Sequence, residues 1–212
     1  MDQLDLKTGD LMLFDSNNTG FLKLFDWVIK TATRSNYNHI GVILKDPTYI
    51  KEGLKGLFLY ESSWEGTPDP ADGKVKLGVQ ITPLEEAIKN NKGKILIRKL
   101  KCDTDETYQT TFSPENILSV YKESNAKPYD IHPKDWIEAL FRLDTEPQKT
   151  GQFFCSALVG YVYTKLGILK SNTDWSILRP SDFSIEDENK HLYYQTGFSL
   201  DDKQIEMMSE SA

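Results

Sequence analysis

The sequence has few of the residues that bind metals or form disulfides. Its 212 residues include two cysteines, Cys102 and Cys155, and three histidines. Two cysteines cannot build a disulfide framework, and neither has another Cys or a His nearby at the spacing of a zinc site. We therefore expect two reduced thiols, no metal site and no cofactor.

Long apolar stretches and clusters of basic residues are also missing. No segment approaches the roughly 20 apolar residues of a membrane span. The N-terminal stretch MDQLDLK lacks the basic start and apolar run of a secretory signal. The net charge of −7 argues against a broad nucleic-acid surface, which needs clustered Lys and Arg. We therefore expect a cytoplasmic protein that does not bind nucleic acid.

The sequence does contain a series of short apolar runs separated by turns. These runs predict strands at residues 11–14, 38–44, 57–62, 75–81 and 94–100, the second and third forming a hairpin. Helical spacing and start signals predict helices at 82–88 (with Thr82 as cap), 113–123, 134–141 and 155–165, and residues 102–111 are expected to form a loop. The expected fold is one α+β domain over residues 1–200, in which an antiparallel sheet or small barrel packs against helices. Residues 201–212 are expected to form an acidic, disordered tail.

An amphipathic segment from Phe21 to Lys30 allows two interpretations. Its apolar residues follow helical spacing, with Lys23, Asp26 and Lys30 on the other side. Aromatic residues flanked by lysines are typical of a helix at a membrane surface, which would give the protein a peripheral membrane contact. The alternative, which we favour, is a helix that packs on the core.

Cys155 stands where a short apolar approach turns into the helix predicted at 155–165. A helix N-terminus has unpaired N–H groups and partial positive charge, which stabilise a thiolate and can bind an oxyanion. The alternative is a buried cysteine that serves as a small apolar side chain. Its position makes Cys155 the candidate nucleophile.

A cysteine nucleophile needs a base and a group that orients the base. His39 opens an apolar strand, and Glu61 ends another strand where an acidic residue breaks the apolar pattern. Adjacent strands can place these two side chains on one face of a sheet. Each of them has a structural alternative when taken alone. Their joint occurrence at element boundaries predicts a Cys155–His39–Glu61 triad.

Two other residues near these positions are weaker candidates. The backbone N–H of Cys155 is the natural oxyanion donor, and the side-chain amide of Gln152 is a candidate for a second donor. Tyr37 lies two residues before His39 and is expected to line the substrate pocket.

Six stretches of the chain resemble the permuted branch of the NlpC/P60 papain-like superfamily. This branch includes bacterial YiiX-type proteins, the lecithin:retinol acyltransferase-like group and a poxvirus protein. The stretches are TGDLMLF (8–14), SNYNHIGVI (35–43), YES (60–62), KPYD (127–130), FFCSALV (153–159) and RPSDF (179–183). They run in the permuted order of that branch, with the His strand before the Cys helix.

The resemblance implies a permuted papain-like fold with Cys155 as nucleophile, His39 as base and Glu61 as the orienting residue. It implies cleavage of an amide (peptide or isopeptide) or an acyl ester through a thioester intermediate, and it places Tyr129 near the site. Glu61 fits the YiiX-like pattern, whereas the acyltransferase-like group has a second His in this role. We therefore expect hydrolysis of a peptide or lipid substrate and do not carry over the transferase activity.

A function of another class stays open. In this alternative the same cleft holds an acyl chain or a peptide without catalysis, in a binding module or a virion component. The many Lys, Asn, Asp, Glu and Ile residues, together with the resemblance, suggest a large DNA virus or an intracellular bacterium as the source. A viral protein of this kind would lie in the host cytoplasm or in the virion.

Overall fold

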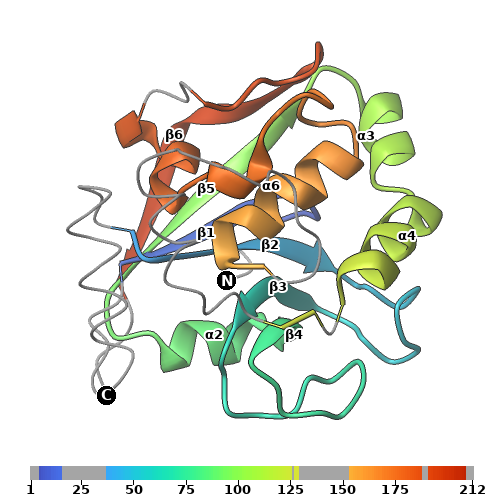
Figure 1. Ribbon diagram of the computed structural model, residues 1–212, viewed down its shortest axis with the longest axis vertical. Coiled ribbons are helices and arrows are strands. Elements are labelled where there is room, and N and C mark those ends of the chain that lie inside the picture. The colour runs from blue at the N-terminus through green and yellow to red at the C-terminus, as the bar shows by residue number, and fades with distance from the viewer. Residues whose placement is uncertain (1–4, 16–36, 126, 129–152, 188–190, 209–212) are drawn as a thin grey trace.

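The computed structural model describes residues 5–15, 37–125, 127–128, 153–187 and 191–208. Within these ranges the chain forms one antiparallel sheet of six strands (Figure 1). The strands are β1 (Leu11–Asp15), β2 (His39–Lys45), β3 (Leu57–Ser63), β4 (Gly78–Pro83), β5 (Lys94–Cys102) and β6 (Phe198–Met208). Their order across the sheet is β4-β3-β2-β1-β5-β6. The predicted α+β class is confirmed, and the sheet is open, with β4 and β6 at its edges.

Among the described residues, one helix lies between β4 and β5, and the others lie between β5 and β6. They are α2 (Leu84–Asn90), α3 (Asp105–Thr111), α4 (Pro114–Ser124) and α6 (Cys155–Lys165), followed by the 3-10 turns η1 (Trp175–Ile177), η2 (Pro180–Phe183) and η3 (Ile185–Asp187). None of the helices in these ranges has the length and apolar character needed to cross a bilayer.

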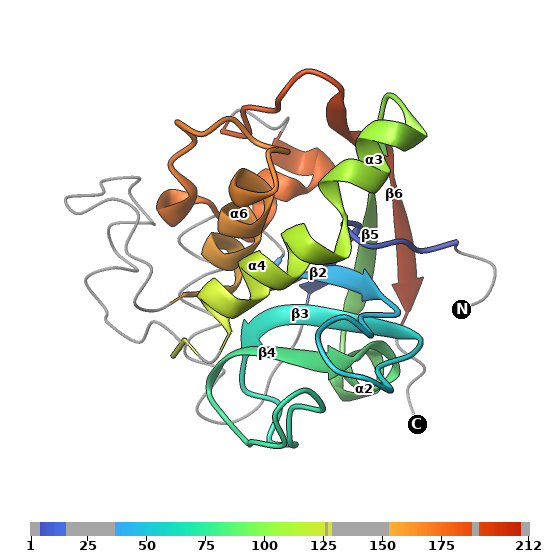
Figure 2. The same ribbon diagram turned by 90° about the vertical axis from the view of Figure 1, so that its right-hand side faces the viewer.

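The sheet buries apolar side chains on both of its faces. Alternate residues such as Leu13 and Val42 pack with α4 and α6, whereas Met12 and Ile43 pack with Leu84 and other residues of α2 (Figure 2). Successive side chains of a strand point to opposite faces. Burial on both faces therefore explains why these strands are continuous apolar runs in the sequence.

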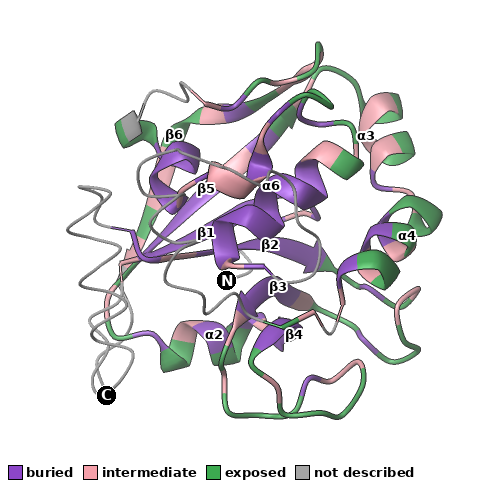
Figure 3. Cartoon of the chain, viewed as in Figure 1, coloured by how far each residue is buried: buried purple, intermediate pink, exposed green. Residues whose placement is uncertain are grey.

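Helix α6 is the central helix of the larger core. Its residues from Cys155 to Tyr163 are all buried, as Figure 3 shows along most of the helix. The helix ends before Gly167, whose φ of 72° is left-handed backbone that favours glycine. The predicted bounds of this helix, 155–165, are confirmed. Its N-terminus, which carries Cys155, is thus fixed to the sheet by packing on β2 and β3.

The turn before β1 shows what the Thr-Gly-Asp stretch does in the fold. The buried Asp10 carboxylate accepts backbone N–H groups of Lys7 at 3.0 Å and Leu100 at 2.9 Å, which ties the turn to β5. Burial raises the pKa of Asp10, and the two backbone N–H groups act against that rise. Gly9 has a φ of 96°, and a Cβ there would lie 2.3 Å from the ring of Phe112. This motif is a structural anchor.

The expected acidic tail is wrong over residues 201–208, which belong to β6. The strand pairs with β5 from Lys94 to Cys102. Leu200 is buried, and Ile205 and Met207 pack against the core on the α2 side of the sheet. Lys94 pairs with Glu206 at 3.1 Å. Glu206 therefore alternates with the apolar Ile205 and Met207. The acidic residues of β6 have the basic neighbours Lys94 and Lys101 on β5.

Two smaller predictions are also corrected. Residues 105–111 form α3 in place of a loop, with the Thr104 side chain accepting the Thr107 N–H at the helix start. Thr82 belongs to β4, and the helix after it begins at Leu84 with Pro83 as its N-cap. The predicted helices at 21–30 and 134–141 and the last residues, 209–212, lie outside the described residues.

Candidate active site

His39 and Glu61 meet at the end of two antiparallel strands. His39 is the first residue of β2, and Glu61 lies near the end of β3, which pairs with β2. The imidazole Nε2–H donates to Glu61 Oε2 at 2.6 Å. The other carboxylate oxygen, Oε1, accepts the Thr82 hydroxyl at 2.5 Å. With both oxygens bonded and 1% of the side chain exposed, the carboxylate is held in one orientation.

Cys155 reaches the same place from the other side, as the first residue of α6. Phe154 before it has extended backbone and makes no side-chain capping bond. The sulfur lies 4.0 Å from the backbone carbonyl oxygen of Asn38, the residue next to His39. The thiol is also close enough to the imidazole of His39 to raise the pKa of the ring. Because Nε2 is engaged by Glu61, Nδ1 is the ring nitrogen left to exchange a proton with the thiol.

The surroundings of His39 change its proton affinity. Burial acts against the charged ring and lowers its pKa, but the hydrogen bonds and negative charges of Cys155 and Glu61 outweigh burial. The pKa of His39 is therefore raised well above its ordinary value of 6.5. The ring is packed 5.4 Å from that of Phe14 and stays 22% exposed, so it keeps a path to solvent.

Of the three weaker candidates, only Tyr37 lies in the described part of the chain. It is buried, and its hydroxyl donates to Glu186 Oε1 and accepts the side-chain amide of Gln204, each at 3.1 Å. Burial raises the pKa of Tyr37 to about 12. A place in the pocket wall stays a prediction for this residue. Gln152 and Tyr129 lie outside the described residues, so their roles also stay predictions.

Thr82 is a partner of the site beyond the residues predicted from the sequence. The signal was present, because an acidic residue inside a buried strand needs donors for both of its oxygens. The adjacent strand β4 can supply one, and it places Thr82 on the same face as Glu61. Thr82 was instead interpreted as a helix cap because it stands before Pro83.

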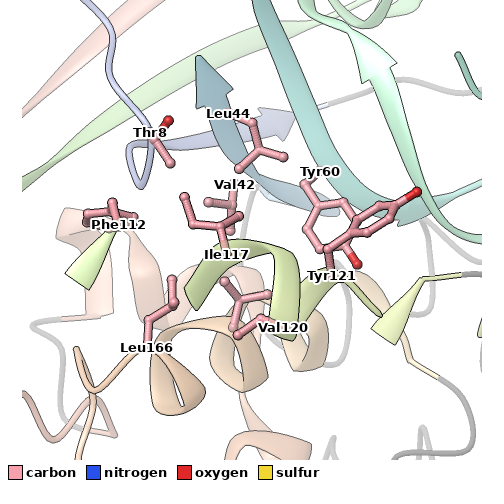
Figure 4. Close-up of a pocket in the computed structure, with 10 residues that line it drawn as sticks. Thr8, Val42, Leu44, Tyr60, Phe112, Ile117, Val120, Tyr121 and Leu166 are labelled. Carbon is pink, nitrogen blue, oxygen red and sulfur yellow. The ribbon is translucent and has the colours of Figure 1, made fainter. Parts of the chain in front are cut away.

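Two further observations concern metal ligands and an internal cavity, whose walls include none of Cys155, His39 and Glu61. Among the described residues, no group of three or more His, Cys, Asp or Glu side chains is arranged to hold a metal ion. An apolar cavity of about 10 Å³ lies between β2, β3, α4 and α6, and its walls include Val42, Tyr60 and Leu166 (Figure 4). Such a volume is about what one water molecule needs, so this cavity cannot hold an acyl chain.

Comparisons with known proteins give a distant structural likeness. No family model matches the sequence. No curated protein matches it either. The fold is similar to the crystal structure of the metalloprotein YiiX from Escherichia coli O157:H7, with 16% identity and a TM-score of 0.49 over 92% of this chain and 96% of that chain. This likeness is too distant to assign a role to any residue here.

Proposed function

We propose that this chain is a cysteine-dependent hydrolase with Cys155 as nucleophile, His39 as base and Glu61 as the orienting residue. The proposal rests on one observation: Glu61 holds the imidazole of His39 at 2.6 Å, and the Cys155 sulfur lies 4.0 Å from the carbonyl oxygen of Asn38, the residue next to His39. A raised His39 pKa favours the pair of thiolate and imidazolium, which is the reactive form of a cysteine nucleophile.

The proposed reaction has two halves. The Cys155 thiol gives its proton to His39, and the thiolate attacks the carbonyl carbon of an amide or an acyl ester. The carbon–nitrogen or carbon–oxygen bond breaks, the imidazolium gives its proton to the leaving group, and a thioester remains on Cys155. Water, losing a proton to His39, then attacks the thioester. The acid is released and the thiol is regenerated.

The start of α6 supports stabilisation of the oxyanion. The carbonyl oxygen becomes negative during each attack, and the backbone N–H of Cys155 at the helix start is the first candidate donor. In this proposal the overall arrangement is permuted papain-like, because the strand with the base precedes the helix with the nucleophile. Peptide, isopeptide and lipid ester remain the candidate substrates, cleaved in the cytoplasm.

The burial of Cys155 favours a second candidate function. Only 2% of the residue is exposed, which fits a catalytically silent module that binds a peptide or an acyl chain. The two functions differ in the reactivity of the thiol. A silent module needs no thiolate, whereas a hydrolase needs a thiolate that substrates and alkylating reagents can reach.

Alkylation of the two cysteines tests the proposal. We expect iodoacetamide at pH 7 to modify Cys155 faster than Cys102, which is half-buried and bonds through its sulfur to the Thr104 carbonyl. The H39A variant should slow the reaction at Cys155 by roughly tenfold or more and leave Cys102 unchanged. Mass spectrometry of the peptides gives both rates. Equal, slow rates that do not change in H39A would favour the silent module.

A further inference from the structure

The backbone next to Cys155 is anchored by a serine on the strand that carries Glu61. Ser62 is fully buried, and its hydroxyl donates to the backbone carbonyl of Phe153 at 2.7 Å. Glu61 and Ser62 are neighbours in β3, so their side chains point to opposite faces of the sheet. One strand therefore holds the imidazole through Glu61 and the approach to Cys155 through Ser62.

A second serine anchors the backbone on the other side of Cys155. Ser156 is also buried, and its hydroxyl donates to the backbone carbonyl of Leu178 at 2.7 Å. Leu178 follows η1, which packs along α6 through Trp175. The nucleophile thus lies between two buried hydrogen bonds that reach separate parts of the fold.

The first turn of a helix needs such anchors when capping is weak. The N-terminal N–H groups of a helix are commonly fixed by a capping side chain. Phe154, the N-cap of α6, supplies no such bond. The hydroxyls of Ser62 and Ser156, which bond to the backbone on either side of the helix start, can instead fix the position of the sulfur. Proton transfer to His39 depends on that position, and small displacements in an active site are costly in rate.

We propose that Ser62 and Ser156 are positioning residues that hold the Cys155 sulfur against the His39 imidazole. This inference rests on the proposed function. It assigns neither serine to the chemistry, since the hydroxyl of each is used on a backbone carbonyl. It predicts that removing either hydroxyl loosens the contact between sulfur and imidazole while the fold persists.

The test uses the variants S62A and S156A of the full chain, with Y163F as the matched control. Tyr163 lies in the same helix, and its buried hydroxyl also donates to a backbone carbonyl, that of Gly9. The rates of Cys155 alkylation by iodoacetate and by iodoacetamide are measured from pH 5 to about pH 10, together with unfolding in urea. An imidazolium beside the sulfur attracts the anionic reagent, so the ratio of the two rates reports the protonated ring.

We expect each serine variant to react with iodoacetate about ten- to a hundredfold more slowly than the parent protein. The ratio of the iodoacetate rate to the iodoacetamide rate should also begin to fall at a lower pH than in the parent protein, because a displaced thiolate raises the pKa of His39 less. The Y163F variant should keep the parental rates and pH dependence, even where it loses stability.

A serine variant with lowered stability but parental rates and pH dependence would overturn the inference and leave the hydroxyl a merely structural role. S156A decides the question if S62A does not fold. A parent protein whose Cys155 reacts no faster than Cys102 would instead overturn the proposed function, and the inference with it. The two failures are therefore distinct.

Discussion

Glu61 illustrates how a single buried carboxylate can serve two partners. One oxygen accepts the imidazole of His39 and the other accepts the hydroxyl of Thr82. A carboxylate bonded at both oxygens cannot rotate without breaking one of these bonds. The ring of His39 is thereby held through Nε2, which leaves Nδ1 for the proposed proton exchange with Cys155. The same carboxylate also favours the protonated ring, which raises the pKa of His39.

We expect the E61Q variant to lower the pKa of His39, since a neutral amide offers no charge to the imidazolium. As the pH rises, His39 loses its proton and the rate of Cys155 alkylation by iodoacetate falls. The midpoint of that fall should move to a lower pH by about one unit or more in E61Q. The matched control is E65Q, which removes a carboxylate four residues further on that bonds to Asn90 and acts on His39 through its charge without a hydrogen bond to the ring. The control should shift this pH much less. Equal shifts in both variants would contradict a direct role for Glu61.

At this scale the sequence predicted the residues whose chemistry is visible without their partners. Cys155, His39 and Glu61 could be proposed because each is an unusual residue near the boundary of an element. The structure joins His39 to Glu61 and places the Cys155 sulfur beside the Asn38 carbonyl, and their roles stay a prediction. A donor for the second oxygen of Glu61 could be expected from the sequence, but which residue supplies it depends on the strand pairing that brings Thr82 close. The contribution of Ser62 could not be predicted, because its partner lies 91 residues away in the chain.

Among the elements, β4 connects to the nucleophile through a short segment of chain. Gly78 pairs with Pro128, and the Val79 N–H donates to the Lys127 carbonyl at 2.9 Å. The Pro128 carbonyl in turn accepts the N–H of Phe153 at 3.1 Å. Residues 127–128 therefore lie between the edge of the sheet and the approach to Cys155.

The G78A variant tests this connection. Gly78 has a φ of 144°, and a Cβ there would lie 2.2 Å from the backbone oxygen of Lys127, which cannot turn aside as a side chain can. Backbone strain and overpacking together should lower the free energy of unfolding by about 2–4 kcal/mol. The control G73A has a φ of 76° with open space around its Cβ, and should lose only about 1 kcal/mol. Unfolding in urea measures the free energy of unfolding of both variants. Equal losses would show that residues 127–128 shift to make room for the added Cβ and contradict this connection.

Elements with strong apolar patterns were predicted well, and those without them were not. The start of α6 and the apolar strands β1, β2, β3 and β5 were predicted close to their observed bounds. Helix α3 has no buried residue, so its sequence carries no apolar period. Strand β6 mixes acidic and apolar residues, and only its pairing with β5 makes that alternation meaningful.

At the scale of the whole molecule, β6 forms one edge of the sheet and pairs with β5, a strand from near the middle of the chain. Strand β6 pairs along β5, and Gln204 on β6 donates its amide to the hydroxyl of Tyr37, just ahead of His39. The end of the described chain is thus linked to the strand that carries the proposed base.

A truncation tests the importance of β6 directly. A chain that ends at Leu200 lacks residues 201–212, for which the sequence predicts a tail. It therefore loses the contacts of Ile205 and Met207 with the core. We expect its free energy of unfolding to fall by at least about 2–3 kcal/mol. A chain that ends at Met208 keeps all of β6 and is the control. Identical urea curves for the two chains would show that this half of the strand adds no stability.

The alternation of Glu61 and Ser62 also has a consequence for how this protein can vary. Inserting or deleting one residue in β3 ahead of them would exchange the faces of both side chains, so the imidazole and the helix start would lose their supports in one event. Length changes are therefore expected to be absent from this strand in any active homologue. They belong instead in the exposed turns on either side of it, around Gly53 and Gly73, where the surroundings leave room.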